Sequence, residues 1–335
     1  MTDWQRLVPQ VRLAALALLV APSLYAADEP LDWLLRMADA VERVNYQGTM
    51  VHMHGGQADI LRIVHRFENG KVSERITTVD GPSREIIRND EEVTCILPDQ
   101  DAVVVEPREA HSVTQSPLQG RLPRLDELDQ RYYELAFVDD AVVAGRSTRV
   151  LEVRPMDGFR FGYRLALDTQ TALPLKSQLI DVNGQTVEEI MFTTVELAQE
   201  ISAGDLEPSL STTDLKVQRL QDATDTGADG ALRSGWQVAK LPDGFMLIAA
   251  RAKLAPGAPG PMEQLVYSDG LASVSLFIEM KMEEDAGAEG LSGMGAANAY
   301  TTVVDGYLVT AVGEVPARTV EMMAMSAAPL ALAGR

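Results

Sequence analysis

The chain has few of the residues that cross-link or catalyse. Its 335 residues include one cysteine, Cys95, so no disulfide can form within the chain. Aromatic residues make up only 5%, and there are four histidines. Cys95 lies in an apolar run that predicts a strand, with no His or Lys beside it to activate the thiol, so we expect it to be structural. Hydrophobic cores must therefore hold the fold.

The motifs of common enzyme classes are also missing. There is no Gly-x-Ser-x-Gly elbow, no dinucleotide-binding glycine fingerprint, no phosphate-binding loop and no His-Glu-x-x-His. Paired carboxylates such as Glu91-Glu92 and Asp139-Asp140 coincide with predicted turns, which is typical of solvated surface. We therefore expect neither enzymatic activity nor a cofactor.

His52 and His54 are the strongest metal-ligand candidates. They are two residues apart on a predicted strand, so both side chains leave the same face, and a hairpin could bring His65 alongside. No carboxylate or Cys stands at ligand spacing, which favours ordinary polar strand residues and no metal. A metal-dependent hydrolase is the enzymatic alternative.

The first 26 residues have the features of a secretory signal peptide. Arg6 and Arg12 precede the apolar run 13–21, and Tyr25-Ala26-Ala27 offers small residues for cleavage after Ala26. The run is shorter than the roughly 20 residues that span a bilayer, although an uncleaved anchor is the alternative. We therefore expect the protein to be exported.

The chain is strongly acidic. Its formal charge is −20, and loss of Asp3, Arg6 and Arg12 with the signal peptide leaves 27 basic against 48 acidic residues, or −21. Such a chain repels nucleic acid and anionic membrane surfaces. It suits a soluble protein that meets a basic or apolar surface, although the charge could also serve solubility alone.

Periodicity predicts two β-rich modules. A helix over 31–44 precedes period-two strands with hairpins at Asn69-Gly70 and Asn183-Gly184, and a short helix around Leu122, Leu125 and Leu128 could cover the sheet. Apolar periodicity then fades before further strands and a last helix that begins near Pro316. The predicted organisation is a signal peptide at 1–26, a β domain at 27–204, a linker at 205–235, a small β+α domain at 236–328 and a tail at 329–335.

An apolar stripe is the main candidate for a binding surface. From Phe159 to Leu167 the odd positions are all large and apolar, so one face of that strand is buried or lines a cavity. Ordinary core is the simpler interpretation. As lining of a lipid-accepting cavity we nominate Val51, Met53, Phe159, Phe161, Tyr163 and Leu165.

Five sequence blocks resemble a known family. Residues 79–88 (VDGPSREIIR), 168–175 (DTQTALPL), 241–245 (LPDGF), 267–270 (YSDG) and 312–316 (VGEVP) are similar, in order, to blocks of the RseB/MucB family of sigma-E factor regulatory proteins. Each block is weak alone, but the ordered set is specific and covers nearly the whole mature chain.

The resemblance implies a mainly β (α+β) fold and a regulatory function. The large domain would be an incomplete antiparallel β-barrel like the carriers LolA and LolB, closed over by helices, and the small domain a sheet with a C-terminal helix. The expected partner is the periplasmic region of a membrane-spanning anti-sigma factor of RseA/MucA type, shielded from a regulatory protease until a lipid or lipopolysaccharide-like signal loosens the complex. The blocks lie at turns and strand ends, so they transfer no partner-binding residues.

A periplasmic lipid or lipoprotein carrier of LolA type is the alternative function. A simple carrier would not need the second module that begins near Trp236. An exposed apolar groove would also favour self-association, so homo-oligomers are a further expectation.

Overall fold

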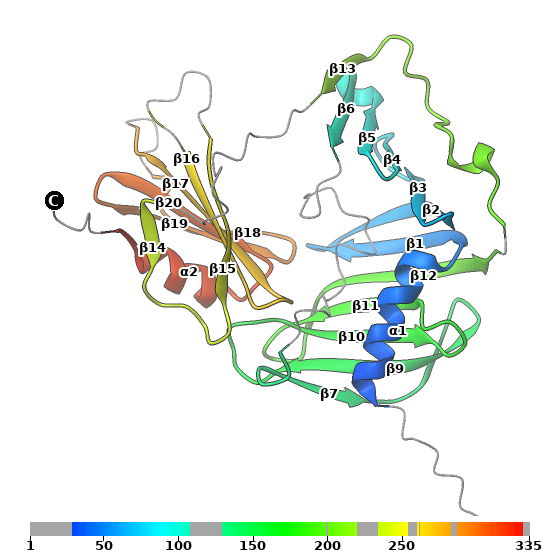
Figure 1. Ribbon diagram of the computed structural model, residues 1–335, viewed down its shortest axis with the longest axis horizontal. Helices are drawn as coiled ribbons and strands as arrows, with labels where there is room; N and C mark the ends of the chain where they lie inside the picture. Colours follow the sequence, from blue (N-terminus) through cyan, green and yellow to red (C-terminus); the bar gives the residue numbers. More distant parts are fainter. Residues whose placement is uncertain are drawn as a thin grey trace, which may run out of the picture.

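The computed structural model describes residues 29–107, 129–198, 200–219, 234–253, 260, 262–282 and 287–330. Its β-strands form one large sheet, one small sheet and a two-stranded ribbon (Figure 1). No helix within these residues is long and apolar enough to cross a membrane. The expected signal peptide and the helix around Leu122 lie outside the described residues.

The first sheet has thirteen strands and is antiparallel except at one edge. Its order is β13-β6-β5-β4-β3-β2-β1-β12-β11-β10-β9-β7, with β8 paired to β9. The strands are β1 (Tyr46–His54), β2 (Gln57–Glu68), β3 (Lys71–Thr78), β4 (Glu85–Arg88), β5 (Glu92–Leu97), β6 (Ala102–Pro107), β7 (Tyr133–Phe137), β8 (Ala141–Val143), β9 (Arg146–Pro155), β10 (Gly162–Asp168), β11 (Pro174–Ile180), β12 (Thr186–Leu197) and β13 (Lys216–Arg219). Because β13 and β7 end the series, the barrel is incomplete, as expected.

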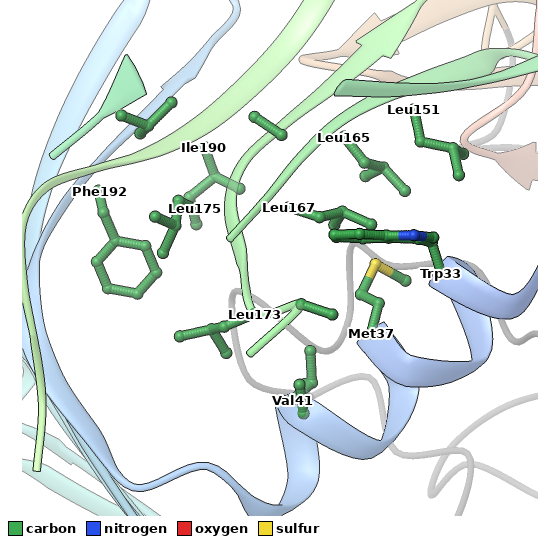
Figure 2. Packing of buried hydrophobic residues seen from close by; sticks show 14 of the residues in the cluster. Trp33, Met37, Val41, Leu151, Leu165, Leu167, Leu173, Leu175, Ile190 and Phe192 are labelled. Carbon is green, nitrogen blue, oxygen red and sulfur yellow. The ribbon is translucent and has the colours of Figure 1, made fainter. Parts of the chain in front are cut away.

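Helix α1 (Pro30–Arg43) packs across the strands β9 to β12. Pro30 occupies the first turn, where a missing N–H costs nothing. Figure 2 shows Trp33, Met37 and Val41 of α1 directed at a layer of sheet side chains. That layer contains Leu151, Leu165, Leu167, Leu173, Leu175, Ile190 and Phe192, all buried. The helix therefore closes the core of the large domain.

The second sheet and its helix form a separate core. The sheet order is β15-β16-β17-β20-β19-β18, and β14 pairs with β21. The elements are β14 (Trp236–Val238), β15 (Met246–Lys253), β16 (Met262–Ser268), β17 (Ser273–Met280), β18 (Gly290–Met294), β19 (Ala297–Val304), β20 (Tyr307–Gly313), α2 (Ala317–Met325) and β21 (Ala327–Pro329). Val320 and Met323 of α2 are fully buried beside Val274 and Val309. The small antiparallel sheet with a C-terminal helix is confirmed.

The beginning of the segment expected as a linker is bound to the large domain. The 3₁₀ helix at Ala203–Leu206 is followed by Ser209 and Leu210, whose N–H groups donate to the buried Glu85 carboxylate at 2.9 and 3.0 Å. Strand β13 then pairs in parallel with β6. The polar, turn-rich sequence of this segment does not predict its attachment to the large domain, because the residues that hold it belong to distant strands.

Candidate functional site

The two domains meet at a buried ion pair. Arg160, in the bend before β10, places Nη1 3.1 Å from Oδ2 of Asp269, and both side chains are fully buried. The Tyr133 hydroxyl donates to the same Oδ2 at 2.8 Å. Burial and the Asp269 carboxylate raise the pKa of Tyr133, so the phenol stays protonated and acts as donor.

Local structure on the small domain holds Asp269 in position. Asp269 lies in the turn between β16 and β17, where its Oδ1 accepts hydrogen bonds from the N–H groups of Leu271 and Ala272 at 2.9 and 2.7 Å. One carboxylate oxygen thus closes a turn while the other faces Arg160. This is the YSDG block of the sequence, and its acidic residue serves contact between domains as well as turn formation.

Aromatic rings and a second turn of the small domain also contact the Arg160 guanidinium. Its guanidinium carbon lies 4.8 Å from the ring centre of Tyr132 and 5.3 Å from that of Phe245. Its Nη2 donates to the carbonyl of Asp243. Gly244, with φ +87°, lies so close to Tyr132 that a Cβ would stand 2.4 Å from the ring, so this close approach requires glycine.

Helix α2 adds a second set of contacts between the two domains. Thr319 Oγ1 donates to the carbonyl of Phe159 at 2.8 Å, and Arg318 Nε donates to the carbonyl of Gly158. The bend 157–160 of the large domain is therefore held by both the turn 242–244 and the start of α2. We refer to these contacts together with the Arg160–Asp269 pair as the domain seam.

A small pocket, with a cavity volume of about 10 Å³, opens beside the seam. Tyr163, Leu179, Glu188 and Ile190 line it from the large domain, with Ser177, and Glu314 lines it from the small domain. Antiparallel register places Tyr163 opposite Leu179 and Leu179 opposite Glu188, so the floor is one row across β10, β11 and β12. The floor is apolar at one end and carries a carboxylate at the other.

Three of the six residues nominated as cavity lining lie at or near the pocket. Tyr163 lines the pocket, and Phe161 packs beside it against Leu179 and Ala296. Leu165 is fully buried in the core next to α1. These three residues therefore lie in or next to the floor of the pocket.

The other three nominated residues lie away from the pocket floor. Phe159 belongs to the seam. Val51 and Met53 are on the face of β1 opposite Tyr46 and Met50, because strand side chains alternate, and Met53 is 39% exposed. Whether any nominated residue contacts lipid stays a prediction.

Sequence reasoning missed the residues that build the seam. The sequence analysis used only the apolar odd positions of 159–167, and it placed Asp269 in a block at a turn. Arg160 stands between two phenylalanines, and nothing along the chain indicates that its partner is a carboxylate 109 positions later.

Comparisons with known proteins identify the family. Residues 29–210 match the MucB/RseB N-terminal domain, and residues 231–328 match the MucB/RseB C-terminal domain. The chain is 34% identical over 326 residues to the sigma factor AlgU regulatory protein MucB of Pseudomonas aeruginosa, covering 95% of this chain and 96% of that protein.

Solved structures agree. The complex of Pseudomonas aeruginosa MucA and MucB matches with a TM-score of 0.69 and 31% identity, covering 90% of this chain and 99% of that one. A crystal structure of MucB matches with a TM-score of 0.59 and 31% identity, covering 89% and 97%. These relatives are regulatory proteins rather than enzymes. The chain therefore belongs to the MucB/RseB family.

Proposed function

We propose that this protein is a periplasmic regulator that binds the periplasmic region of a membrane-spanning anti-sigma factor of the MucA/RseA type. It shields that region from regulated proteolysis and releases it in response to a lipid-like envelope signal. The observation that carries the proposal is the similarity to MucB in complex with MucA, at a TM-score of 0.69 over 90% of the chain.

The seam and the pocket provide a route for the lipid response. The pocket has a cavity volume of about 10 Å³, which is room for about one water molecule and far too little for an acyl chain. An acyl chain that enters along Tyr163 and Leu179 must therefore enlarge the space between the domains. Because Glu314 of the small domain lines the same pocket, this enlargement would strain the Arg160–Asp269 contact and change the surface offered to the partner.

Compartment and charge fit this role. We also propose a signal peptide over residues 1–26 and domains at 27–204 and 236–328. In the segment 205–235 between them, β13 pairs with β6 of the large domain. The mature charge of −21 favours a basic segment of the partner and disfavours nucleic acid, since complementary charge speeds encounter and suppresses wrong partners.

A titration tests the proposal. The mature chain from Ala27 is titrated by calorimetry with the periplasmic segment of the host's anti-sigma factor, and again after addition of an acylated lipid. We expect tight binding that the lipid weakens. No binding to the segment, together with uptake of lipid, would replace the regulator by a carrier of LolA type.

A protease assay tests the shielding. The same segment is exposed to the regulatory protease with and without the mature chain, and lipid is then added to the protected sample. Protection that lipid removes agrees with the proposal, whereas cleavage at an unchanged rate contradicts it. A chain already saturated with lipid is the matched control, since it carries the same domains without the capacity to respond.

A further inference from the structure

A cluster of metal-ligating side chains lies at the tip of the β1–β2 hairpin. The rings of His52 and His54 stack with centroids 4.5 Å apart, and His54 Nε2 is 2.9 Å from Asp59 Oδ2. One ligand atom from each of these three residues lies within 4.8 Å of the others. Oε1 of Glu188 contacts Nε2 of His52. Glu188 therefore adds a second carboxylate on the same face of the sheet.

The fold supplies the ligands that the sequence spacing lacks. In the sequence, no carboxylate stands at a spacing typical of metal ligands from the two histidines. That spacing favoured ordinary polar strand residues over a metal site. Antiparallel pairing sets Asp59 of β2 opposite His52 and Glu188 of β12 opposite His54. Three strands thus bring two imidazoles and two carboxylates to one face of the sheet.

This donor set matches a particular class of ion. Imidazole and carboxylate ligands together suit Zn²⁺ and its neighbours, which bind at about 2.0–2.2 Å, whereas Ca²⁺ and Mg²⁺ prefer oxygen alone. The side chains of His54 and Asp59 are 30% and 49% exposed, so they can rotate to close the present spacing around an ion. We propose that His52, His54, Asp59 and Glu188 form a binding site for a divalent transition metal, with Zn²⁺ as the fitting ion.

The site touches both the pocket and the small domain. Glu188 lines the pocket, and a Cβ on Gly295, in the turn between β18 and β19, would stand 3.7 Å from His54 Nδ1. A bound metal would fix His54 and Glu188 in position against that turn. Metal occupancy and docking of the small domain therefore involve the same side chains.

Calorimetric titration of the metal-stripped mature chain with Zn²⁺ alone tests the site. We expect one ion per chain, and with Co²⁺ a visible absorption band from the bound ion. His54→Ala and Asp59→Asn remove partly exposed ligands and should each weaken Zn²⁺ binding by about 100-fold or more, because even outer-shell partners are worth about 10–100-fold. His111→Ala, which removes a histidine outside the described residues, is the matched control and should bind like the unaltered chain.

Three outcomes overturn the proposal. These are no binding of Zn²⁺ or Co²⁺ by the folded chain, binding that both His54→Ala and Asp59→Asn leave unchanged, and binding that His111→Ala removes. Circular dichroism of the metal-free variants verifies that each is folded, so that a loss of binding reports the site. Asp59→Asn keeps the size of the side chain and guards against a purely structural effect of His54→Ala.

Discussion

Arg160 of the large domain and Asp269 of the small domain form an ion pair at 3.1 Å in which neither side chain is exposed to solvent. Two charges this deeply buried tolerate the loss of neither partner, because a remaining single charge has no water to solvate it. The pair therefore makes the relative position of the domains sensitive to any event that separates them.

Arg160→Met should uncouple the domains. It leaves Asp269 buried without its cation, and we expect a loss of about 3–5 kcal/mol in the free energy of unfolding. Because each domain has its own core, urea denaturation followed by tryptophan fluorescence should resolve into two transitions.

A double-mutant cycle and a surface pair control that measurement. Asp269→Asn keeps the acceptor for the turn but removes the charge, so the double variant should lose less stability than the two single variants added together. Arg131→Met, which breaks an ion pair with Asp129 at the surface, should leave the urea denaturation curve unchanged. Additive effects of Arg160→Met and Asp269→Asn would contradict a coupled pair.

Met37→Ala should destabilise the large domain through a cavity beneath α1. Met37 is 1% exposed and packs into the sheet layer, so its truncation should cost about 2–5 kcal/mol. Leu35→Ala on the same helix is the matched control, because Leu35 is 50% exposed and its loss should change stability by about 0.5 kcal/mol or less. Equal urea midpoints for the two variants would show that α1 does not close the core.

Asp168 should make the fold acid-labile. Burial tends to raise its pKa, but hydrogen bonds from Arg146 at 2.7 Å and from Thr171 outweigh this and hold the pKa below its ordinary value. The carboxylate therefore contributes stability above its unfolded pKa of about 3.9, and that stability is lost as pH falls through the lower folded pKa.

Melting temperatures measured between neutral and strongly acidic pH check this. Asp168→Asn should melt at a lower temperature than the unaltered chain at neutral pH, and the two should converge in acid. Asp140→Asn, in an exposed loop, is the control and should follow the unaltered chain throughout. A constant difference between Asp168→Asn and the unaltered chain at every pH would rule out the carboxylate charge as the cause.

Phe161→Asp should abolish the lipid response while the folded protein still binds its partner. Phe161 packs beside the pocket with Leu179 and Ala296, and a carboxylate there would oppose an acyl chain. The measurement is the lipid-dependent loss of partner binding. Val142→Asp, at a position 72% exposed, is the surface control and should respond normally.

Met53→Asp separates the two faces of β1. If the lipid enters the pocket described here, this variant on the opposite face should keep a normal response, and Val51 and Met53 would then leave the set of cavity residues. Loss of the response in Met53→Asp but not in Phe161→Asp would place the lipid on the outer face instead.

Local pattern determined most of the elements of this protein. Alternating apolar residues predicted a series of strands in both modules, because a half-buried strand shows period two in its own sequence. Asn69-Gly70 marked a hairpin, since both residues adopt positive φ there, at 55° and 79°. The short strands β8, β13, β14, β18 and β21 were not predicted, because their pairing depends on a partner strand rather than on their own periodicity.

Only the tertiary structure decided which side chains from distant parts of the sequence come into contact. His52, Asp59 and Glu188 converge because β1 pairs with both β2 and β12, and the sequence separation of 136 residues between His52 and Glu188 hides that relationship. Arg160 and Asp269 meet because two separately folded cores dock against each other. Side-chain periodicity reports which face of an element is buried, but the identity of the neighbour on that face depends on register and docking, which are set by the whole chain.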